Sequence, residues 1–459
     1  MSIFESRLTT LREVVEKLVD GSHNPPPKQE QGIPMLSARN VENGRIVFDE
    51  FRYISKPAFE QENARTRVSP GDVLLTIVGT IGRAAVVPHG APQFSLQRSV
   101  AVLTPKPVLL SKYLCYQLQA PDVQRYFDEN ARGTAQKGVY LKTLGATPIL
   151  VPPVLEQEAV VAEIEKQFSR LDEAVANLHR VKANLKRYKA AILKAAVEGR
   201  LVENEASIAH REGRSYETGE QLLLRILEVR RSQWAGRGKY KQAIDSEQPE
   251  NLVVPAGWSV ASLDMLSIDS GYGTSQKCGY ENAGPPVLRI PNVQNGVLDL
   301  QDVKFAPADF RLREIEAVQQ GDMLIIRTNG SKTLIGRAAV VLAEQATPMS
   351  FASYLIRFRL TRVGHIPDWV SLVWQTSKMR EWIEAQAATS AGQHNVSMTV
   401  LARAAIPVPP ASEQVRITSE VDRQLTILRG VEAEVDTNLK RAQALRQSTL
   451  AKAFSGDCT

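Results

Sequence analysis

Two stretches decide the fold: PMLSARNVENG, from Pro34 to Gly44, and PVLRIPNVQNG, from Pro286 to Gly296. They lie 252 residues apart and share their first proline, an Asn-Val pair and an Asn-Gly pair. Three more pairs of segments recur in the same order: GDVL at 71–74 and GDML at 321–324, IGRAAVV at 81–87 and at 335–341, and VPP followed by EQ at 151–157 and at 408–414. A repeat this long, present twice, predicts a duplicated domain and not a solenoid, whose units are far shorter.

The first part of each copy has the pattern of a mixed α/β globule. Residues 72–78 and 322–328 follow a glycine and are rich in large apolar side chains, which is typical of buried strands. Further strands are expected at 84–87, 99–103 and 354–360, and helices at 112–130 and 368–388. Asn-Gly at 43–44 and 295–296 predicts two hairpins, because the central positions of a type I′ turn need positive φ.

The second part of each copy reads as one long helix, from residue 156 to about 199 and from 413 to about 456. Apolar residues recur there every three or four positions in a narrow stripe, as in helices that pack on a partner helix. The chain leaves the first globule on one helix and returns on the other, so we expect an antiparallel pair; helices that pack separately on their own globules are the alternative. The predicted helix–helix seam comprises Ile164, Phe168, Leu171, Val175, Leu178, Leu185, Val421, Leu425, Leu428, Val435 and Leu439, and the stripe also includes Tyr188 and Leu445.

The expected fold is therefore two α/β (α+β) globular domains, separated by a pair of long antiparallel coiled-coil helices, with a pseudo-two-fold internal repeat. The predicted boundaries are 1–154 for the first globule, 155–201 for the first long helix, 202–254 for a linker, 255–411 for the second globule and 412–459 for the second long helix. Within the linker, residues 220–234 form a predicted amphipathic helix, and 236–241 a basic stretch.

Composition restricts the class of protein. The chain has 459 residues, enough for several domains with real cores, and a formal net charge of +6, which is compatible with a polyanionic partner. We find no run of eighteen apolar residues, so no membrane span is expected, and the N-terminal sequence does not resemble a signal peptide. The three cysteines (Cys115, Cys278 and Cys458) are far apart, which favours a reducing cytoplasm and argues against a zinc site.

No catalytic or metal-binding motif is recognisable. Phosphate-cradling glycine loops, paired histidines at metal spacing and a nucleophile elbow are all missing from the sequence. Residues 24–27, Asn-Pro-Pro-Pro, are similar to the loop of amino-methyltransferases that stacks a flipped base, but Pro27 stands at the aromatic position, and we expect a turn. No catalytic residue and no metal ligand are therefore predicted.

Polar and basic side chains occupy corresponding loops of the two globules. Such side chains hydrogen-bond to base edges and phosphates. The candidate DNA contacts are Ser22, His23, Asn24, Arg39, Gln97, Arg98, Arg132, Gln136 and Lys137 in the first globule, and Thr274, Ser275, Lys277, Arg289, Arg327, Asn329, Lys332, Gln393, His394 and Asn395 in the second. Asn40 and Asn292, like Arg83 and Arg337, lie in the most repeated stretches, so we expect structural roles for them.

Together these features resemble the specificity subunit of Type I restriction–modification systems over essentially the whole length. The paired segments quoted above carry the likeness, and Pro255–Trp258 (P-A-G-W) looks like the opening of a target-recognition domain. The resemblance implies that each globule reads one half of a bipartite, asymmetric DNA target, and that the helices set the spacer and dock two modification subunits. Those partners would bind S-adenosylmethionine, restriction subunits would use ATP and Mg, and this cytoplasmic chain would catalyse nothing.

Two other readings stay open. A stand-alone DNA methyltransferase or nuclease would need a cofactor loop and catalytic carboxylates in a recognisable setting. A protein-interaction scaffold without DNA specificity would need only the helices and two globules, and a salt-dependent DNA titration separates it from a DNA reader.

Overall fold

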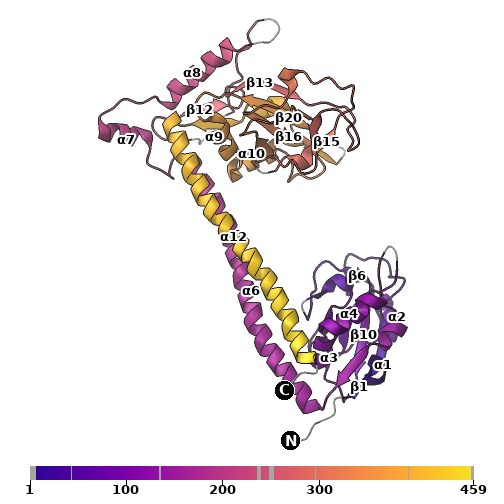
Figure 1. The fold of residues 1–459 in the computed structure, drawn as a ribbon. Coiled ribbons are helices and arrows are strands. Elements are labelled where there is room, and N and C mark those ends of the chain that lie inside the picture. Colours follow the sequence, from indigo (N-terminus) through magenta and orange to yellow (C-terminus); the bar gives the residue numbers. More distant parts are fainter. Residues whose placement is uncertain are drawn as a thin grey trace. The chain divides into compact units, whose positions relative to one another are not determined.

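The computed structural model describes residues 7–42, 44–133, 136–234, 239–247, 253–294, 296–390 and 392–455. The chain divides into two compact units. Unit 1 comprises Met1–Val181 with Glu434–Thr459, and unit 2 comprises Lys182–Ala433 (Figure 1). Each unit therefore contains one globule and one part of each long helix.

Unit 1 is built on a four-stranded antiparallel sheet in the order β2-β10-β7-β8 (Val15–Asp20, Val100–Pro105, Val73–Thr76 and Ala84–Val86). Alternate residues of its strands serve two cores. Val73, Leu75 and Leu103 face α3 (Ser111–Leu118), whereas Leu74 and Val102 pack with the parallel pair β3 and β9 (Ile33–Leu36 and Ser95–Leu96). The remaining elements are β1 (Arg7–Thr10), α1 (Leu11–Val14), η1 (Ala38–Asn40), β4 (Val41–Glu42), β5 (Arg45–Ile46), β6 (Arg52–Ile54), α2 (Lys56–Thr66), α4 (Pro121–Asn130), α5 (Leu141–Gly145) and β11 (Pro148–Val151).

Unit 2 repeats this topology. Its sheet has the order β13-β20-β16-β18 (Ser267–Tyr272, Leu355–Leu360, Asp322–Ile326 and Ala338–Val340), and β14 (Pro286–Leu288) again pairs in parallel with β19 (Ser350–Phe351). The remaining elements of this globule are β12 (Ser259–Ser262), η2 (Ile290–Asn292), β15 (Lys304–Phe305), η3 (Glu314–Glu316), β17 (Thr328–Asn329), α9 (Ile366–Trp374), α10 (Ser377–Gln386), β21 (Ala388–Ser390), β22 (Gln393–Asn395), α11 (Met398–Ala402) and β23 (Ala405–Val408). The predicted internal repeat is confirmed strand by strand.

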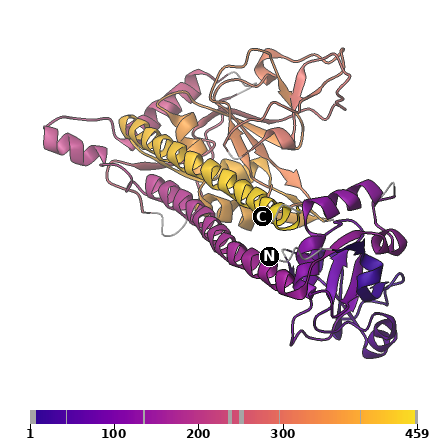
Figure 2. The same cartoon turned by 60° about the horizontal axis from the view of Figure 1, so that its bottom comes forward.

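The two long helices are α6 (Val154–Val197) and α12 (Ala411–Phe454), each uninterrupted in both views (Figures 1 and 2). They begin directly after the Pro-Pro pairs, and α12 continues through Gly430. In unit 1, Ile164 and Phe168 of α6 pack with Leu450 of α12. In unit 2, Ile192 of α6 shares a core with Val421 of α12. Residues near the start of α6 contact the end of α12, and residues near the end of α6 share a core with the start of α12. The two helices therefore run antiparallel.

The seam is narrower than the apolar stripe suggested. Leu171, Val175, Leu178 and Leu185 are half-buried. By contrast, Leu445 is 57% exposed and Tyr188 is 55% exposed, so these two members of the stripe lie outside the seam. In unit 1 polar groups frame the contact: Arg446 Nη1 is 2.9 Å from Asp172 Oδ1, and its guanidinium carbon is 4.0 Å from the ring centroid of Phe168.

Three other expectations are wrong in detail. The helix expected at 112–130 is two helices, α3 and α4, because Pro121 opens a new one at its first turn. The helix expected at 368–388 is likewise divided into α9 and α10, where Thr376 caps the second. The segment 202–254 also holds a helix that we did not predict, α7 (Glu205–Glu212), ahead of α8 (Gly219–Ser232). Leu222 of α8 is fully buried in the core of unit 2, so this part of the expected linker belongs to the globule.

The described residues on either side of the two Asn-Gly pairs are joined across the chain. Val41 pairs with Ile46 and Glu42 with Arg45. In unit 2, Gln294 N donates to Val297 O at 3.1 Å, and Gly296 has a φ of 90°. Asn43 and Asn295, like Gly236–Gly238 of the basic stretch and Gly456 after α12, lie outside the described residues.

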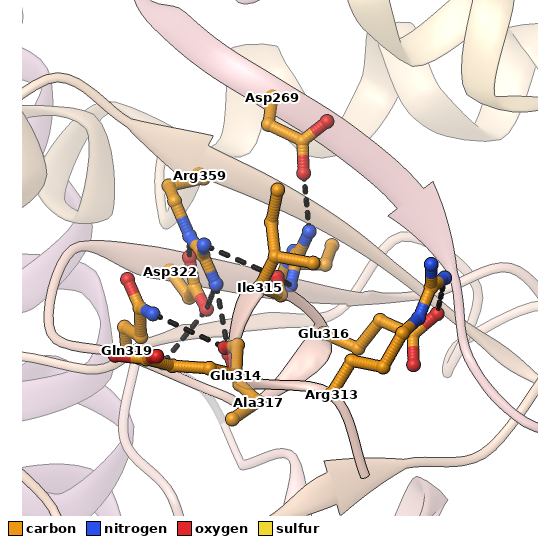
Figure 3. Close-up of polar contacts among 10 residues, drawn as sticks. Asp269, Arg313, Glu314, Ile315, Glu316, Ala317, Gln319, Asp322 and Arg359 are labelled. Carbon is orange, nitrogen blue, oxygen red and sulfur yellow. Dashed lines mark hydrogen bonds and ion pairs between the residues drawn. The ribbon is translucent and has the colours of Figure 1, made fainter. Parts of the chain in front are cut away.

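A buried aspartate anchors the central sheet of each unit through different partners. In unit 1, Asp72 accepts hydrogen bonds from Lys17 Nζ at 2.9 Å and Thr104 Oγ1 at 2.5 Å. In unit 2, Asp322 is bound by Arg359, with Nε to Oδ1 at 2.7 Å and Nη2 to Oδ2 at 3.0 Å (Figure 3). The two arrangements use equivalent register positions, because Thr104 lies opposite Lys17 and Arg359 lies opposite Asp269.

The second arrangement also fixes the loop before β16. Arg359 donates to Ala317 O at 2.8 Å and to Ile315 O at 3.2 Å (Figure 3). Arg357 donates to Ile315 O at 3.0 Å and forms an ion pair with Asp269. Two arginines thus hold the segment around η3 against the sheet.

In the described ranges, none of the helices is long and apolar enough to cross a membrane.

Candidate nucleic-acid interface

The candidate loops of unit 1 gather at one end of its central sheet. Strand β2 ends at Asp20, β7 ends at Thr76, and β10 and β8 begin at Val100 and Ala84. Because neighbouring strands in this sheet run antiparallel, all four of these termini lie at the same end of the sheet. The connecting loops at 21–24, 77–83 and 97–99 therefore converge there, and backbone hydrogen bonds tie them together.

These ties are specific. Arg98 N donates to Ser22 O at 2.9 Å, and Ile77 N donates to Ser99 O at 2.9 Å. Gly79 N donates to Lys137 O at 3.1 Å, which adds the loop of Arg132, Gln136 and Lys137. Ala38 N donates to Ser99 Oγ at 3.0 Å, which places η1 and Arg39 nearby.

In each unit, the glycine after the first strand of the central sheet lies directly against the backbone of another segment. A Cβ on Gly21 would lie 2.2 Å from Leu96 O, and one on Gly273 would lie 2.1 Å from Phe351 O. Both distances are far shorter than any van der Waals contact, so only glycine fits at either position. The same crossing in both units confirms that the loops after β2 and β13 are equivalent.

Unit 2 has an additional three-stranded sheet at the corresponding end of its central sheet. Strands β17, β22 and β21 pair so that Asn329 lies opposite His394 and Thr328 opposite Asn395. Val396 N donates to Arg327 O at 2.9 Å, which joins this sheet to the end of β16. The Arg327 guanidinium carbon lies 4.7 Å from the ring centroid of Tyr272 at the end of β13, a cation–π contact. Thr274, Ser275 and Lys277 follow β13 at the same end, and Lys332 is exposed in the loop after β17.

Most candidate side chains are accessible. His23, Asn24, Arg39, Arg98, Arg132, Gln136, Lys137, Ser275, Lys277, Lys332, Gln393 and Asn395 are exposed, whereas Gln97, Thr274, Arg327, Asn329 and His394 are half-buried. Two others are engaged inside the protein. Ser22 is buried and its hydroxyl donates to Glu62 Oε1 at 2.9 Å. Arg289 forms an ion pair with Asp302 at 3.1 Å, beside the ring of Tyr280.

The repeated asparagines are structural, as expected. Asn40 Nδ2 donates to Val47 O at 3.0 Å and Asp49 O at 2.7 Å. Asn292 makes the equivalent bonds to Asp299 O and Asp302 O, both at 2.8 Å. Each asparagine therefore ties the start of its loop to carbonyl groups seven to ten residues further along the chain.

The repeated arginines behave differently. Arg83 precedes β8 at the candidate end of the sheet, and its side chain is exposed, while that of Arg337 is half-buried. Their expected structural role is not supported by the exposure of Arg83. The sequence did offer a signal for a binding role, namely that both repeats carry the same arginine. A DNA contact that does not depend on the base sequence would be the same in both repeats.

Two observations in the described residues bear on metal and covalent chemistry. No three histidine, cysteine, aspartate or glutamate side chains cluster there as metal ligands would. Burial raises the pKa of the Cys115 thiol to about 12, which makes it a poor nucleophile. Residues 24–27 lie in a loop in which Pro26 O accepts a hydrogen bond from Arg52 at 3.2 Å.

Comparison with known proteins bears on this architecture. Residues 9–187 match the family described as the Type I restriction modification DNA specificity domain. The chain is 22% identical over 432 residues to the Type I restriction enzyme EcoKI specificity subunit of Escherichia coli (strain K12), covering 93% of this chain and 82% of that protein. The chain is similar in sequence to the Type I specificity subunits.

Other comparisons agree. The StySPI specificity subunit of Salmonella potsdam is 21% identical over 436 residues, with 94% of this chain and 83% of that protein covered. A solved structure of a type I R-M system superposes with a TM-score of 0.62 at 17% identity, over 98% of each chain. At that identity the superposition concerns the fold, and it confirms the predicted fold class.

Proposed function

We propose that this chain is the DNA-recognition subunit of a Type I restriction–modification complex, with each globule reading one half of a bipartite, asymmetric target. The observation that supports this most is the gathering of polar loops at the equivalent end of both central sheets. The sheets share one topology, while the loops differ in sequence and in the extra sheet β17-β22-β21 of unit 2. A common scaffold with different loops suits two different half-sites.

The side chains at these ends have the chemistry for both kinds of DNA contact. Gln97, Gln136 and Asn395 can pair with base edges, and arginines such as Arg98 can pair with guanine or phosphate. Arg83 and Arg337 occupy the same position in both units, so we assign them to the phosphate backbone, which has no sequence of its own.

In this proposal α6 and α12 set the unread gap between half-sites and dock two modification subunits, which supply S-adenosylmethionine. Restriction subunits would add ATP- and Mg-dependent translocation and cleavage. The chain itself contributes specificity and no reaction step, and it works where the DNA is, in the cytoplasm.

Replacing Arg83 by alanine is expected to weaken DNA binding equally on target and unrelated duplexes. Loss of one phosphate contact lowers the slope of log affinity against log salt by about 1. A fluorescence titration of the assembled modification complex at several salt concentrations measures this, with Arg225→Ala on α8 as an exposed-arginine control. An affinity that does not depend on salt would contradict DNA recognition, and a loss on one sequence only would contradict the phosphate assignment.

Exchanging residues 1–154 for the matching domain of another specificity subunit is expected to alter one half of the recognised sequence and leave the other unchanged. The reason is that each central sheet carries its own set of loops. Sequencing methylated sites in cells that carry the hybrid reads out both halves together. Modular reading is wrong if both halves change.

A further inference from the structure

A basic cavity lies in unit 2 between α6 and the second globule. Its volume is about 290 Å³, and its walls come from the C-terminal part of α6, the loop before β18 and the start of α10. Four of the lining residues are cationic, namely Lys186, Lys189, Arg337 and Arg380, and none of the described lining residues is acidic. The cavity is therefore suited to an anion.

Three of these four cations have no partner in the part of the chain that the structure describes. Arg380 pairs with Glu384, with Nε 2.6 Å from Oε1. By contrast, the described residues give no ion pair and no side-chain hydrogen bond to Lys186, Lys189 or Arg337. Arg337 is half-buried, and a guanidinium in that setting is normally satisfied by an anion or another hydrogen-bond acceptor.

Positive charge is concentrated in this part of α6. Residues 174–197 contain six lysines and arginines and no aspartate or glutamate. The corresponding residues of α12, 431–454, contain four lysines and arginines and three acidic residues. The correspondence follows from Gln157 and Gln414, whose side chains donate to Pro152 O at 2.8 Å and to Pro409 O at 2.9 Å. The excess of positive charge is thus specific to α6 and is not shared by the two repeats.

In unit 1 the counterpart of Lys189 is neutralised. That counterpart is Arg446, whose Nη1 lies 2.9 Å from Asp172 Oδ1. At the position of Asp172 the second repeat has Arg429, which is exposed. Because two cations cannot form an ion pair, the charge of Lys189 remains available to a ligand.

The position of the cavity indicates which anion it binds. Arg337 directly precedes β18, which begins at the end of the sheet where β16 ends and the candidate loops gather. Helix α10 begins at Ser377 on the same wall and adds the partial positive charge of a helix N-terminus. Lysine and arginine side chains beside a helix N-terminus are the groups that hold DNA phosphates in protein interfaces.

We propose that this cavity binds a backbone phosphate of the DNA, and that Lys186 and Lys189 of α6 contact it together with Arg337. The inference rests on the proposed function and adds to it, because it gives the long helix a DNA contact of its own. The corresponding positions of α12 are Gln443, which is neutral, and Arg446, which is already paired. The contact is therefore made by unit 2, and the phosphate belongs to the half-site that the second globule reads.

The test is a fluorescence titration with DNA of the assembled modification complex that carries Lys186→Gln and Lys189→Gln together. Loss of one neutralised phosphate should lower the slope of log affinity against log salt by about 1. Affinity should fall about tenfold on target and unrelated duplexes alike, and the methylated sequence should not change, because a phosphate carries no base identity. The control replaces Arg187 and Lys194, exposed cations of the same helix that do not line the cavity, by glutamine, and should leave the slope as it was.

Uncharged phosphates locate the contact on the DNA. Duplexes that each carry one methylphosphonate in the half-site of the second globule are titrated against the native and the doubly substituted complex. At one position the methylphosphonate should cost the native complex about tenfold in affinity and the variant nothing, because both changes remove the same interaction.

Three results would overturn the inference. The first is an unchanged salt slope in the variant while the native complex keeps a steep one, which would leave DNA recognition standing. The second is failure of the variant to assemble with the modification subunits on size-exclusion chromatography, because an acidic segment of those proteins would then be the occupant. The third is binding of inorganic phosphate to the native chain, lost in the variant, that does not compete with DNA. A native complex whose affinity does not depend on salt would instead contradict the proposed function itself.

Discussion

Replacing Arg359 by threonine is expected to lower the free energy of unfolding of unit 2 by about 3–5 kcal/mol, because it leaves a buried carboxylate without its counter-ion. Asp322 is fully buried, and Arg359 supplies two of its hydrogen bonds as well as those that hold Ala317 and Ile315. All five tryptophans lie between residues 182 and 433. Urea unfolding of the full chain followed by tryptophan fluorescence therefore reports on unit 2.

Unit 1 supplies the control for this experiment. There Thr104 and Lys17 satisfy Asp72 from the positions of Arg359 and Asp269, and Val102 stands at the position of Arg357. Adding Asp269→Lys and Arg357→Val to Arg359→Thr transfers that arrangement to unit 2. We expect the triple variant to recover at least about half of the lost stability, since the buried carboxylate regains a cation. If it unfolds no later than Arg359→Thr alone, the two arrangements are not interchangeable.

This pair of arrangements shows how far the sequence could predict the fold. The repeated Gly-Asp motif marks β7 and β16 correctly, because a local run of apolar residues after a glycine determines each strand. Nothing local indicates that Asp72 pairs with Lys17 and Asp322 with Arg359, since those partners come from other strands. Strand pairing is non-local, and the register that joins them becomes visible only in the structure.

Helix boundaries were missed for a different reason. Pro121 at the start of α4, and Asn204 and Gly213 at the two ends of α7, are ordinary helix signals in the sequence. The apolar spacing across residues 112–130 masked the first, and the polar composition of α7 masked the others. The amphipathic character of α8 was predicted, but the surface that Leu222 covers was not, because that surface comes from the distant β12.

The sequence could predict which loops belong to the candidate interface, but not that they lie next to one another. Arg98, Lys137 and Arg39 come from separate segments, and only the antiparallel order of the strands brings them to one end of the sheet. Exposure then separates the set: Arg98 is accessible, while Ser22 is turned inward to Glu62. Which of the accessible side chains contact bases stays a prediction.

Deleting seven residues from each long helix is expected to shorten the gap between half-sites without changing either half. Residues 175–181 of α6 and 435–441 of α12 are suitable, because Gln167 binds Thr449 and Asp172 binds Arg446, a register that places these segments opposite each other. Seven residues are one full seam repeat, so the remaining apolar positions still face one another. Each helix becomes about 10 Å shorter at 1.5 Å per residue, which corresponds to roughly three base pairs at about 3.4 Å each.

Sequencing of methylated sites in cells that carry the shortened chain and its partner subunits measures the gap and both half-sites in one experiment. The control replaces His179 and Arg180, both exposed on α6, by alanine without changing the helix length, and should leave the gap as it was. A second variant, with seven residues removed from α6 alone, shifts the seam against α12 and should abolish methylation, because Ile164 and Phe168 can no longer pack with Leu450 while Ile192 packs with Val421. Methylation at the original gap by the doubly shortened chain would show that the paired helices do not determine the spacing.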